Sequence, residues 1–395
     1  QAGAAGQGGH RAGPAARAAP PQPRSPLPRS PRLRARCAGP RRGGPHARRL
    51  APATGGAPVK RSGHLFEQVA SFGGLRRAAR RAACGKRLSS QAAAFLCDLE
   101  REVLRLQREL LEGTYRPGPY RTFAIVDPKR RTISAAPFRD RVVHHALCAA
   151  MEPTLERYAI ADSYACRTGK GTLAALHRAR HYTRRHAWFL KLDVRRYFES
   201  ADHSVLRALL HRLFKDQRLL GLADLVIGAG APGSPPGKGL PIGNLTSQHF
   251  ANLYLGPLDH RIKETLYIPA YCRYLDDLLL FADSQEELAA AGVDVAGFCA
   301  ATLKLELRHE ATRLEPVMAG VPFLGFRIWP GLTRFDARRK RRFCRSMRVL
   351  RRLDTDRVMD QDALARRTTS LVGWAAQADT MMLRRSLLAA VGWLG

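Results

Sequence analysis

The sequence has no acidic residue before Glu67, although basic residues are frequent along its whole length. Lys and Arg number 66 against 33 Asp and Glu, so the formal net charge is +33. Such an excess of one sign implies a polyanionic partner, and nucleic acid is expected before a membrane or an acidic protein.

Long apolar runs are also missing. No run reaches the roughly 18 residues that a membrane span needs, and no apolar signal segment lies near the start. We therefore expect no membrane partner. The eight cysteines form no C-x-x-C pair and no Cys/His cluster, which argues against a zinc site or a disulfide framework. This pattern favours a reducing, cytoplasmic setting.

Residues 1–62 form a low-complexity tract of Ala, Gly, Pro and Arg. Such a composition cannot build a core, so we expect the tract to be disordered. Three interpretations compete: a basic arm that adds phosphate affinity, a transit peptide, or upstream sequence joined to the true start. The chain begins with Gln1 rather than Met, which favours the third.

The rest of the chain is organised around Tyr271–Phe281, in which two adjacent carboxylates, Asp276 and Asp277, are flanked by apolar residues. The pattern predicts a tight hairpin with both acids at its bend. Adjacent acids beside buried strands repel each other and lose water, so we expect a divalent cation to compensate them. A solvated turn is the alternative, because Asp favours turns.

A second apolar strand, Trp188–Leu192, runs into Asp193, and Asp202 is placed to cap the helix that follows. The order of strand, helix, glycine-rich loop, helix and hairpin can build an antiparallel sheet with helices on one face. If the strands are neighbours, Asp193 and Asp276 meet at one edge and can hold two magnesium ions about 4 Å apart.

Other segments predict further elements. We expect one helix over residues 90–111, ended by Gly113, a loop over residues 221–237 and a strand over residues 303–307.

Several basic segments suit phosphate binding. Lys129 and Arg131 lie on a predicted hairpin and can grip a triphosphate, with a solvated basic turn as the alternative. Arg167 and Lys170 lie in a loop whose glycines permit close approach to a nucleic-acid strand, and Gly243 permits the same. The tail predicts a helix with one apolar and one basic face that grips a duplex through residues including Arg338, Arg339, Arg342 and Arg345.

Taken in order, these motifs resemble the reverse transcriptases of prokaryotic retroelements. Tyr274–Asp277 matches the Y-x-D-D box, and Asp193 with Phe198 matches the first catalytic box. Residues 128–131 match the fingers box, and Phe323–Gly325 matches the box after the palm. Y-x-D-D alone is a weak pattern, but the ordered set is very specific. The resemblance extends from about His64 to the C-terminus.

One segment narrows the resemblance. Many retroelement polymerases carry Q-G-x-x-x-S-P, whereas Ile242–Gln248 has the form I-G-x-x-x-S-Q, as in reverse transcriptases of diversity-generating retroelements. Residues 163–167 and 139–147 also look like that group. The resemblance implies RNA copying with frequent errors at adenines, transfer of the cDNA into a variable gene, and a small basic accessory protein as partner.

The resemblance implies an α+β right-hand polymerase fold. Its expected parts are an N-terminal helical region at 63–115, fingers at 116–187, a palm at 188–330 with an antiparallel sheet, and a basic helical thumb at 331–395. The expected partners are template RNA, primer, cDNA and dNTP. Two Mg²⁺ ions, with Mn²⁺ as the alternative, are the expected cofactors.

The resemblance also assigns roles. Asp193, Asp276 and Asp277 are the catalytic residues and metal ligands, with the Val194 backbone beside them. The remaining roles are a steric gate against the ribose 2′-hydroxyl at Phe198, a triphosphate grip at Lys129 and Arg131, and a nucleotide and template pocket at Ile242, Gly243 and Gln248.

Alternatives stay open. The chain can be a related reverse transcriptase of another role, such as phage defence or a group II intron relative, or an inactive RNA-binding remnant. Phe198 argues against an RNA-directed RNA polymerase, and the intact acids argue against the remnant. The family's usual Lys after residue 307 is missing, so the proton donor to pyrophosphate stays open between Arg308, His309 and water.

Overall fold

The computed structural model describes residues 61–86, 89–126 and 130–393. The chain divides into two units, Gln1–Thr54 and Gly55–Gly395, and the description below concerns the second. Nearly all of the 1–62 tract therefore lies outside the described residues, as does Lys129.

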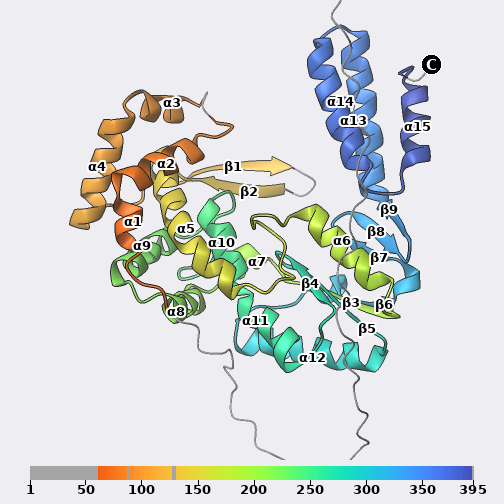
Figure 1. Cartoon of the computed structure of the whole chain (residues 1–395), viewed down its shortest axis with the longest axis horizontal. Coiled ribbons are helices and arrows are strands. Elements are labelled where there is room, and N and C mark those ends of the chain that lie inside the picture. The colour runs from red at the N-terminus through yellow and green to blue at the C-terminus, as the bar shows by residue number, and fades with distance from the viewer. Residues whose placement is uncertain (1–60, 87–88, 127–129, 394–395) are drawn as a thin grey trace, which may run out of the picture. The chain divides into compact units, whose positions relative to one another are not determined.

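A four-stranded antiparallel sheet lies at the centre of this unit (Figure 1). Its strand order is β4–β5–β3–β6, so the hairpin strands β4 and β5 lie beside the strand that ends in Asp193. The predicted neighbourhood of these strands is therefore confirmed. Their bounds are Trp188–Asp193 for β3, Tyr271–Tyr274 for β4, Asp277–Ala282 for β5 and Arg313–Pro316 for β6.

The two faces of this sheet belong to different cores, because side chains alternate along a strand. Leu190, Leu192 and Leu280 enter the larger core, where α12 (Gln285–Ala301) packs on β3 and β5. Phe189 and Phe281 enter the smaller core, where α6 (Thr172–Thr183) packs on β4 and β5. The expected helical cover on one face is thus present in α12, and α6 adds a helix on the other.

Helices complete the larger core. One predicted loop, residues 221–237, is wrong in its first part, because α9 extends through residue 228. Asp216 caps this helix, and its buried Leu219, Ala223 and Val226 recur at helical spacing despite Gly221. The helices of this region are α5 (Phe138–Tyr158), α7 (Tyr197–Ser200), α8 (His203–Leu213), α9 (Gln217–Gly228), α10 (Leu245–Tyr254), α11 (Gly256–His260) and the π-helix η1 (Arg261–Thr265).

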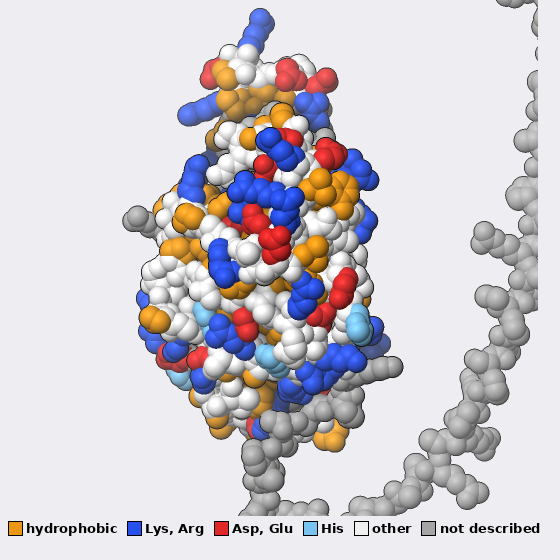
Figure 2. All heavy atoms as spheres, turned by 90° about the vertical axis from the view of Figure 1, so that its left-hand side faces the viewer, with side chains coloured by type: hydrophobic (Ala, Val, Ile, Leu, Met, Phe, Trp, Pro, Cys, Tyr) orange, Lys and Arg blue, Asp and Glu red, His pale blue; other side chains and the backbone are white. Residues whose placement is uncertain are grey.

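The N-terminal helices are α1 (Phe66–Ala70), α2 (Phe72–Ala82), α3 (Ser90–Cys97) and α4 (Leu99–Glu112). The prediction of one helix over 90–111 is wrong, because the backbone leaves helical geometry at Asp98, with φ −123° and ψ 43°. Gly113 ends α4 with a φ of +72°, as predicted. On the face that carries these helices, basic and acidic side chains are interspersed (Figure 2).

A two-stranded hairpin, β1 (Arg121–Val126) and β2 (Arg130–Ala135), follows these helices. Its strands pair antiparallel, with Ile125 opposite Arg131 and Phe123 opposite Ile133. All of β1 is exposed to solvent, so this hairpin offers an open surface.

The C-terminal part combines a three-stranded sheet with three helices. The elements are the 3₁₀ helices η2 (His309–Ala311) and η3 (Val317–Ala319), strands β7 (Val321–Phe323), β8 (Phe326–Trp329) and β9 (Leu332–Phe335), and helices α13 (Ala337–Thr355), α14 (Gln361–Ala375) and α15 (Met381–Ala390).

The predicted strand over 303–307 is wrong, because that segment makes one isolated bridge, between Leu307 and Val194, and adds no strand.

Among the described residues, no helix is long and apolar enough to cross a membrane.

Candidate active site

Three carboxylates meet where β3 ends and β5 begins. Asp193 is the last residue of β3 and lies directly opposite Asp277, the first residue of β5. Asp276 occupies the turn between β4 and β5. The side chains of Asp193 and Asp277 are each 20% exposed. The prediction that the strand acid and the hairpin acids meet at one edge is confirmed.

Burial and mutual repulsion shape the electrostatics of this site. Burial raises the pKa of Asp277 to about 6, and the charges of Asp193 and Asp276 add to the rise, while Lys191 opposes it. Burial also raises the pKa of Asp276, and Asp193 contributes, although the Asp276 backbone and Arg131 act in the other direction. The site therefore holds more negative charge than its surroundings neutralise.

Two cations of the chain engage these carboxylates. Lys191 Nζ lies 2.7 Å from Asp277 Oδ1, and Arg308 Nη1 lies 2.9 Å from Asp193 Oδ2. Within residues 61–86, 89–126 and 130–393, no three His, Cys, Asp or Glu side chains are placed as a ready metal site. The donor set nevertheless fits Mg²⁺ or Mn²⁺, because all three ligands are hard carboxylate oxygens and their three negative charges exceed the two cations that engage them.

A buried ion pair supports the turn that carries Asp276. Arg273 and Asp259 are each 1% exposed, and Arg273 donates from Nη2 and Nε to the two carboxylate oxygens at 2.6 and 2.7 Å. Arg273 Nη1 also donates to the carbonyl of Leu275 at 3.1 Å. Leu275 has a φ of +54°, a strained value for a residue other than glycine. The arginine therefore fixes the backbone conformation that presents Asp276.

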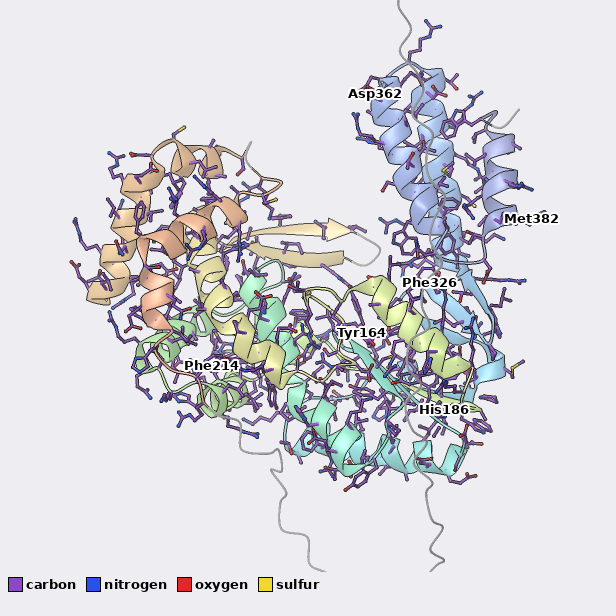
Figure 3. All side chains as sticks on the ribbon, viewed as in Figure 1. Tyr164, His186, Phe214, Phe326, Asp362 and Met382 are labelled. Carbon is purple, nitrogen blue, oxygen red and sulfur yellow. The ribbon has the colours of Figure 1, made fainter. Side chains whose placement is uncertain are left out.

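The loop before α6 braces the same strand. The backbone N–H of Arg273 donates to the Asp162 carbonyl, and that of Tyr164 donates to the Arg273 carbonyl. Figure 3 labels Tyr164 at this junction beside β4. The hydroxyl groups of Thr172 and Tyr274 lie 3.2 Å apart, which links the start of α6 to the Y-L-D-D segment.

Two residues of this loop that are predicted to contact nucleic acid also make contacts within the chain. Arg167 has only 7% of its side chain exposed, pairs with Glu156 and donates to the carbonyls of Ile160 and Ser163. The prediction for Arg167 is therefore corrected: its guanidinium is used within the chain. Lys170 donates to the Ala161 carbonyl and lies 5.2 Å from the centre of the Tyr164 ring.

The β1–β2 hairpin and the loop before α10 contact each other near the carboxylates. Ser134 N donates to the Ile242 carbonyl at 2.9 Å. Gly243 has a φ of +115°, and a Cβ there would lie 2.9 Å from Ile133 Cγ2, so a larger residue does not fit. Arg131 is exposed on β2, and its charge lowers the pKa of Asp276. The structure thus brings Arg131 and the Ile242–Gly243 loop to one site.

The remaining residues predicted to bind metal or nucleotide that the structure describes are Val194, Phe198 and Gln248. Val194 is buried and forms a bridge with Leu307. The two hydrogen bonds of this bridge are made by the Asp193 carbonyl and the Arg195 N–H, so neither of them uses the Val194 carbonyl. Phe198 is half-buried on α7, and its carbonyl accepts from Leu240 N at 2.6 Å. Gln248 lines a cavity of about 490 Å³ between α5 and α10.

Arg339 is also used within the fold. Its guanidinium carbon lies 3.9 Å from the centre of the Trp374 ring and 4.7 Å from that of Phe326, which Figure 3 labels at the base of the C-terminal helices. Burial lowers the pKa of Arg339 to about 10. Gly325 makes room for it, since a Cβ there would lie 2.7 Å from that carbon. The Phe326 and Trp374 rings stack on each other, with 5.0 Å between their centres, and Arg339 lies against both. The predicted nucleic-acid contact of Arg339 is thus corrected to a contact within the fold.

Residues 126–328, slightly more than half of the chain, match the sequence model of the protein family described as reverse transcriptase (RNA-dependent DNA polymerase). The chain belongs to the reverse transcriptase family. The matched region begins at the end of β1 and ends in β8, so it contains all three carboxylates.

Several known proteins are similar to parts of the chain. Protein YkfC of Escherichia coli is 26% identical over 271 residues, which cover 58% of this chain and 71% of that protein. The group II intron-encoded protein LtrA of Lactococcus lactis is 26% identical over 167 residues, covering 40% of this chain and 28% of that protein. Telomerase from Candida albicans, solved with a fragment of telomeric RNA, has a TM-score of 0.45 and 11% identity, over 57% of this chain and 48% of that chain.

Several residues of the reverse-transcriptase site were missed by sequence reasoning. Lys191 lies two residues before Asp193 and therefore on the same face of β3, so strand periodicity could have found it. The partnership of Arg273 with Asp259 joins residues from β4 and α11, and no local pattern predicts it. The sequence indicates Arg308 only as a candidate proton donor and gives no sign of its pairing with Asp193.

The Arg273–Asp259 pair yields a stability prediction. Arg273→Met leaves a fully buried carboxylate without its partner, so we expect the free energy of unfolding to fall by about 3–5 kcal/mol, measured by urea denaturation. Arg195→Met, which removes an exposed pair with Glu306, is the matched control and should change stability by less than about 1 kcal/mol. Equal effects of the two substitutions would contradict the assignment.

The carboxylate cluster yields a prediction about metal-dependent stability. The pKa of Asp276 is higher in the folded chain than its ordinary value of 3.8 in the unfolded chain. Ionisation of Asp276 therefore lowers the free energy of unfolding at pH 7, and this loss disappears below pH 3.8, where the carboxyl is protonated in both states. Without metal, Asp276→Asn should therefore melt no lower than the parent at pH 7.

Addition of Mg²⁺ should reverse this order. At ten times its dissociation constant Mg²⁺ should stabilise the parent by about 1.4 kcal/mol, and Asp276→Asn should lose most of this gain. Thermal melts with and without Mg²⁺ measure both effects. Asp283→Asn, which follows the opposite end of β5, is the control and should keep the Mg²⁺ shift. A full shift in Asp276→Asn would contradict metal binding here.

Proposed function

We propose that this reverse transcriptase copies an RNA template into cDNA by nucleotidyl transfer at the Asp193–Asp276–Asp277 cluster. The observation that carries the proposal is the direct pairing of Asp193 with Asp277 across β3 and β5, beside Asp276 in the turn. Phosphoryl transfer needs positioned charges more than covalent chemistry from the protein, and this cluster supplies the ligands for those charges.

The bound divalent ions would lower the charge on the attacking hydroxyl and on the leaving pyrophosphate. Asp193 and Asp276 would hold them, with Asp277 and the Val194 carbonyl beside them. Arg131 and Lys129 would hold the triphosphate as cations, and the exposed position of Arg131 near Asp276 supports its part. Phe198 would exclude a ribose 2′-hydroxyl.

For the template–primer duplex we propose the outer face of α13. Five exposed arginines recur there every three or four residues, which places them on one side of the helix. Phosphates of a duplex are the expected partner of such a row. The row consists of Arg338, Arg341, Arg345, Arg348 and Arg352. Arg345 and Arg338 belong to the earlier prediction, and Arg342 lies on the same helix.

We propose that the chain is divided into the subdomains of the family's polymerase fold. The N-terminal helical region is 63–115 and the fingers are 116–187, with the open β1–β2 hairpin. The palm is 188–330, with the four-stranded sheet, and the thumb is 331–395, with α13–α15.

For the biological role we propose an error-prone enzyme of a diversity-generating retroelement, with a small basic accessory protein as partner. The I-G-x-x-x-S-Q form of Ile242–Gln248 supports this role, because it resembles that of diversity-generating retroelements. Ile242 lies in the loop that contacts the β1–β2 hairpin, where it can act on base selection. The second candidate is a group II intron-like reverse transcriptase, which the similarity to LtrA favours.

Primer extension by the full chain on an RNA template with Mg²⁺, followed by cDNA sequencing, tests both levels. We expect extension by the parent, at least a hundredfold loss in Asp276→Ala, and errors concentrated opposite template adenines. Ile242→Gln, which restores the commoner family residue, should lower those errors while extension continues.

The other outcomes are equally informative. Faithful copying would keep the polymerase and remove the diversity-generating role. No extension by a folded chain that binds RNA, even with the accessory protein of its own gene neighbourhood added, would favour the RNA-binding remnant. Unchanged activity in Asp276→Ala would remove the metal assignment.

A further inference from the structure

Arg308 is attached to Asp193 at both of its ends. Its backbone N–H donates to the Asp193 carbonyl at 2.8 Å, and its Nη1 lies 2.9 Å from Asp193 Oδ2. The neighbouring bridge between Leu307 and Val194 holds the two segments together. The backbone contact therefore fixes the base of the Arg308 side chain beside the carboxylate, whatever its guanidinium does.

The two cations of the site differ in how firmly they are held. Lys191 has 17% of its side chain exposed and, besides Asp277, donates to the Pro322 carbonyl at 3.0 Å. Arg308 has 41% of its side chain exposed, and among the described residues its guanidinium is bonded to Asp193 alone. The more exposed an ion pair is, the less it stabilises the fold, so the half-exposed Arg308 guanidinium leaves its partner more readily than Lys191 does.

We propose that Arg308 is an exchangeable counter-cation: it occupies Asp193 in the metal-free site and is displaced when a divalent ion binds. A carboxylate oxygen that accepts a guanidinium hydrogen bond has that lone pair occupied, and the positive charge beside it repels a second cation. Arg308 therefore weakens the binding of the first divalent ion to this reverse transcriptase.

The displaced guanidinium has an evident new partner. It is planar, always charged and rich in donors, so it suits a phosphate group. An incoming dNTP would bring its triphosphate to the same carboxylates, and binding of the triphosphate by Arg308 would free Asp193 for the metal. The inference thus adds a coupling between nucleotide and metal binding, and in this part it rests on the proposed polymerase function.

Metal titration of the full chain, without nucleic acid or nucleotide, tests the exchange. The melting temperature is followed against Mg²⁺ concentration for the parent, Arg308→Ala and Arg195→Ala. Arg195 lies on the same edge and pairs with Glu306 in an exposed ion pair, so it controls for loss of a nearby positive charge. We expect the midpoint to fall at least threefold in Arg308→Ala and to stay within a factor of 1.5 in Arg195→Ala.

An unchanged or higher midpoint in Arg308→Ala would overturn the exchange, as would an equal fall in both variants. Arg308→Lys keeps the charge and should lie close to the parent. If Arg308→Ala fails to fold, Arg308→Gln removes the charge while retaining a donor, and the same midpoint decides the question. None of these readouts depends on catalysis, so failure of the polymerase proposal is recognised separately, by absent primer extension in the parent.

The coupling is tested with template–primer and a non-hydrolysable dNTP. The quantity compared is the factor by which the nucleotide lowers the Mg²⁺ midpoint. This factor should be larger in the parent than in Arg308→Ala, where only the contacts of the metal with the phosphates remain. Equal factors in the two proteins would overturn the coupling and leave only the exchange.

Discussion

The structure depends on the register between β3 and β5, which places Asp193 directly opposite Asp277. A shift of one residue would turn Lys191 and Asp193 to the opposite face and remove the leucines from the larger core, so hydrophobic burial fixes the register. The same burial therefore forces three carboxylates together, at a cost that appears as the raised pKa of Asp277 and Asp276. The fold stabilises an arrangement that its own charges oppose.

The surrounding residues make that arrangement tolerable. Lys191 and Arg308 neutralise two of the carboxylates, and the buried Arg273–Asp259 pair holds the strained Leu275 in the turn. These supports differ in exposure, and the difference has a functional meaning. The buried pair is a fixed part of the scaffold, whereas the half-exposed Arg308 can exchange its partner when a stronger cation arrives.

Much of this site could be predicted from the sequence, because its main determinants are local. The apolar strand Trp188–Leu192 that runs into Asp193 and the Asp276–Asp277 hairpin are each visible in a few residues, and their order along the chain allows their pairing. What failed depended on contacts that no local pattern shows. Arg167 and Arg339 look like phosphate ligands in the sequence, but Arg167 pairs with Glu156 of α5, and Arg339 lies against Trp374 of α14. The prediction of one continuous helix over residues 90–111 failed for another reason. The apolar spacing continues through Asp98, although the helical backbone geometry is interrupted there.

The central claim is that β3 and β5 hold a pair of divalent ions between Asp193, Asp276 and Asp277. Its most direct test counts bound Mn²⁺ by electron paramagnetic resonance in the full chain with RNA template, DNA primer and a non-hydrolysable dNTP. The account predicts two ions per chain, and fewer than two in Asp193→Asn under the same conditions. Two bound ions in Asp193→Asn, or none in the parent complex, would contradict it.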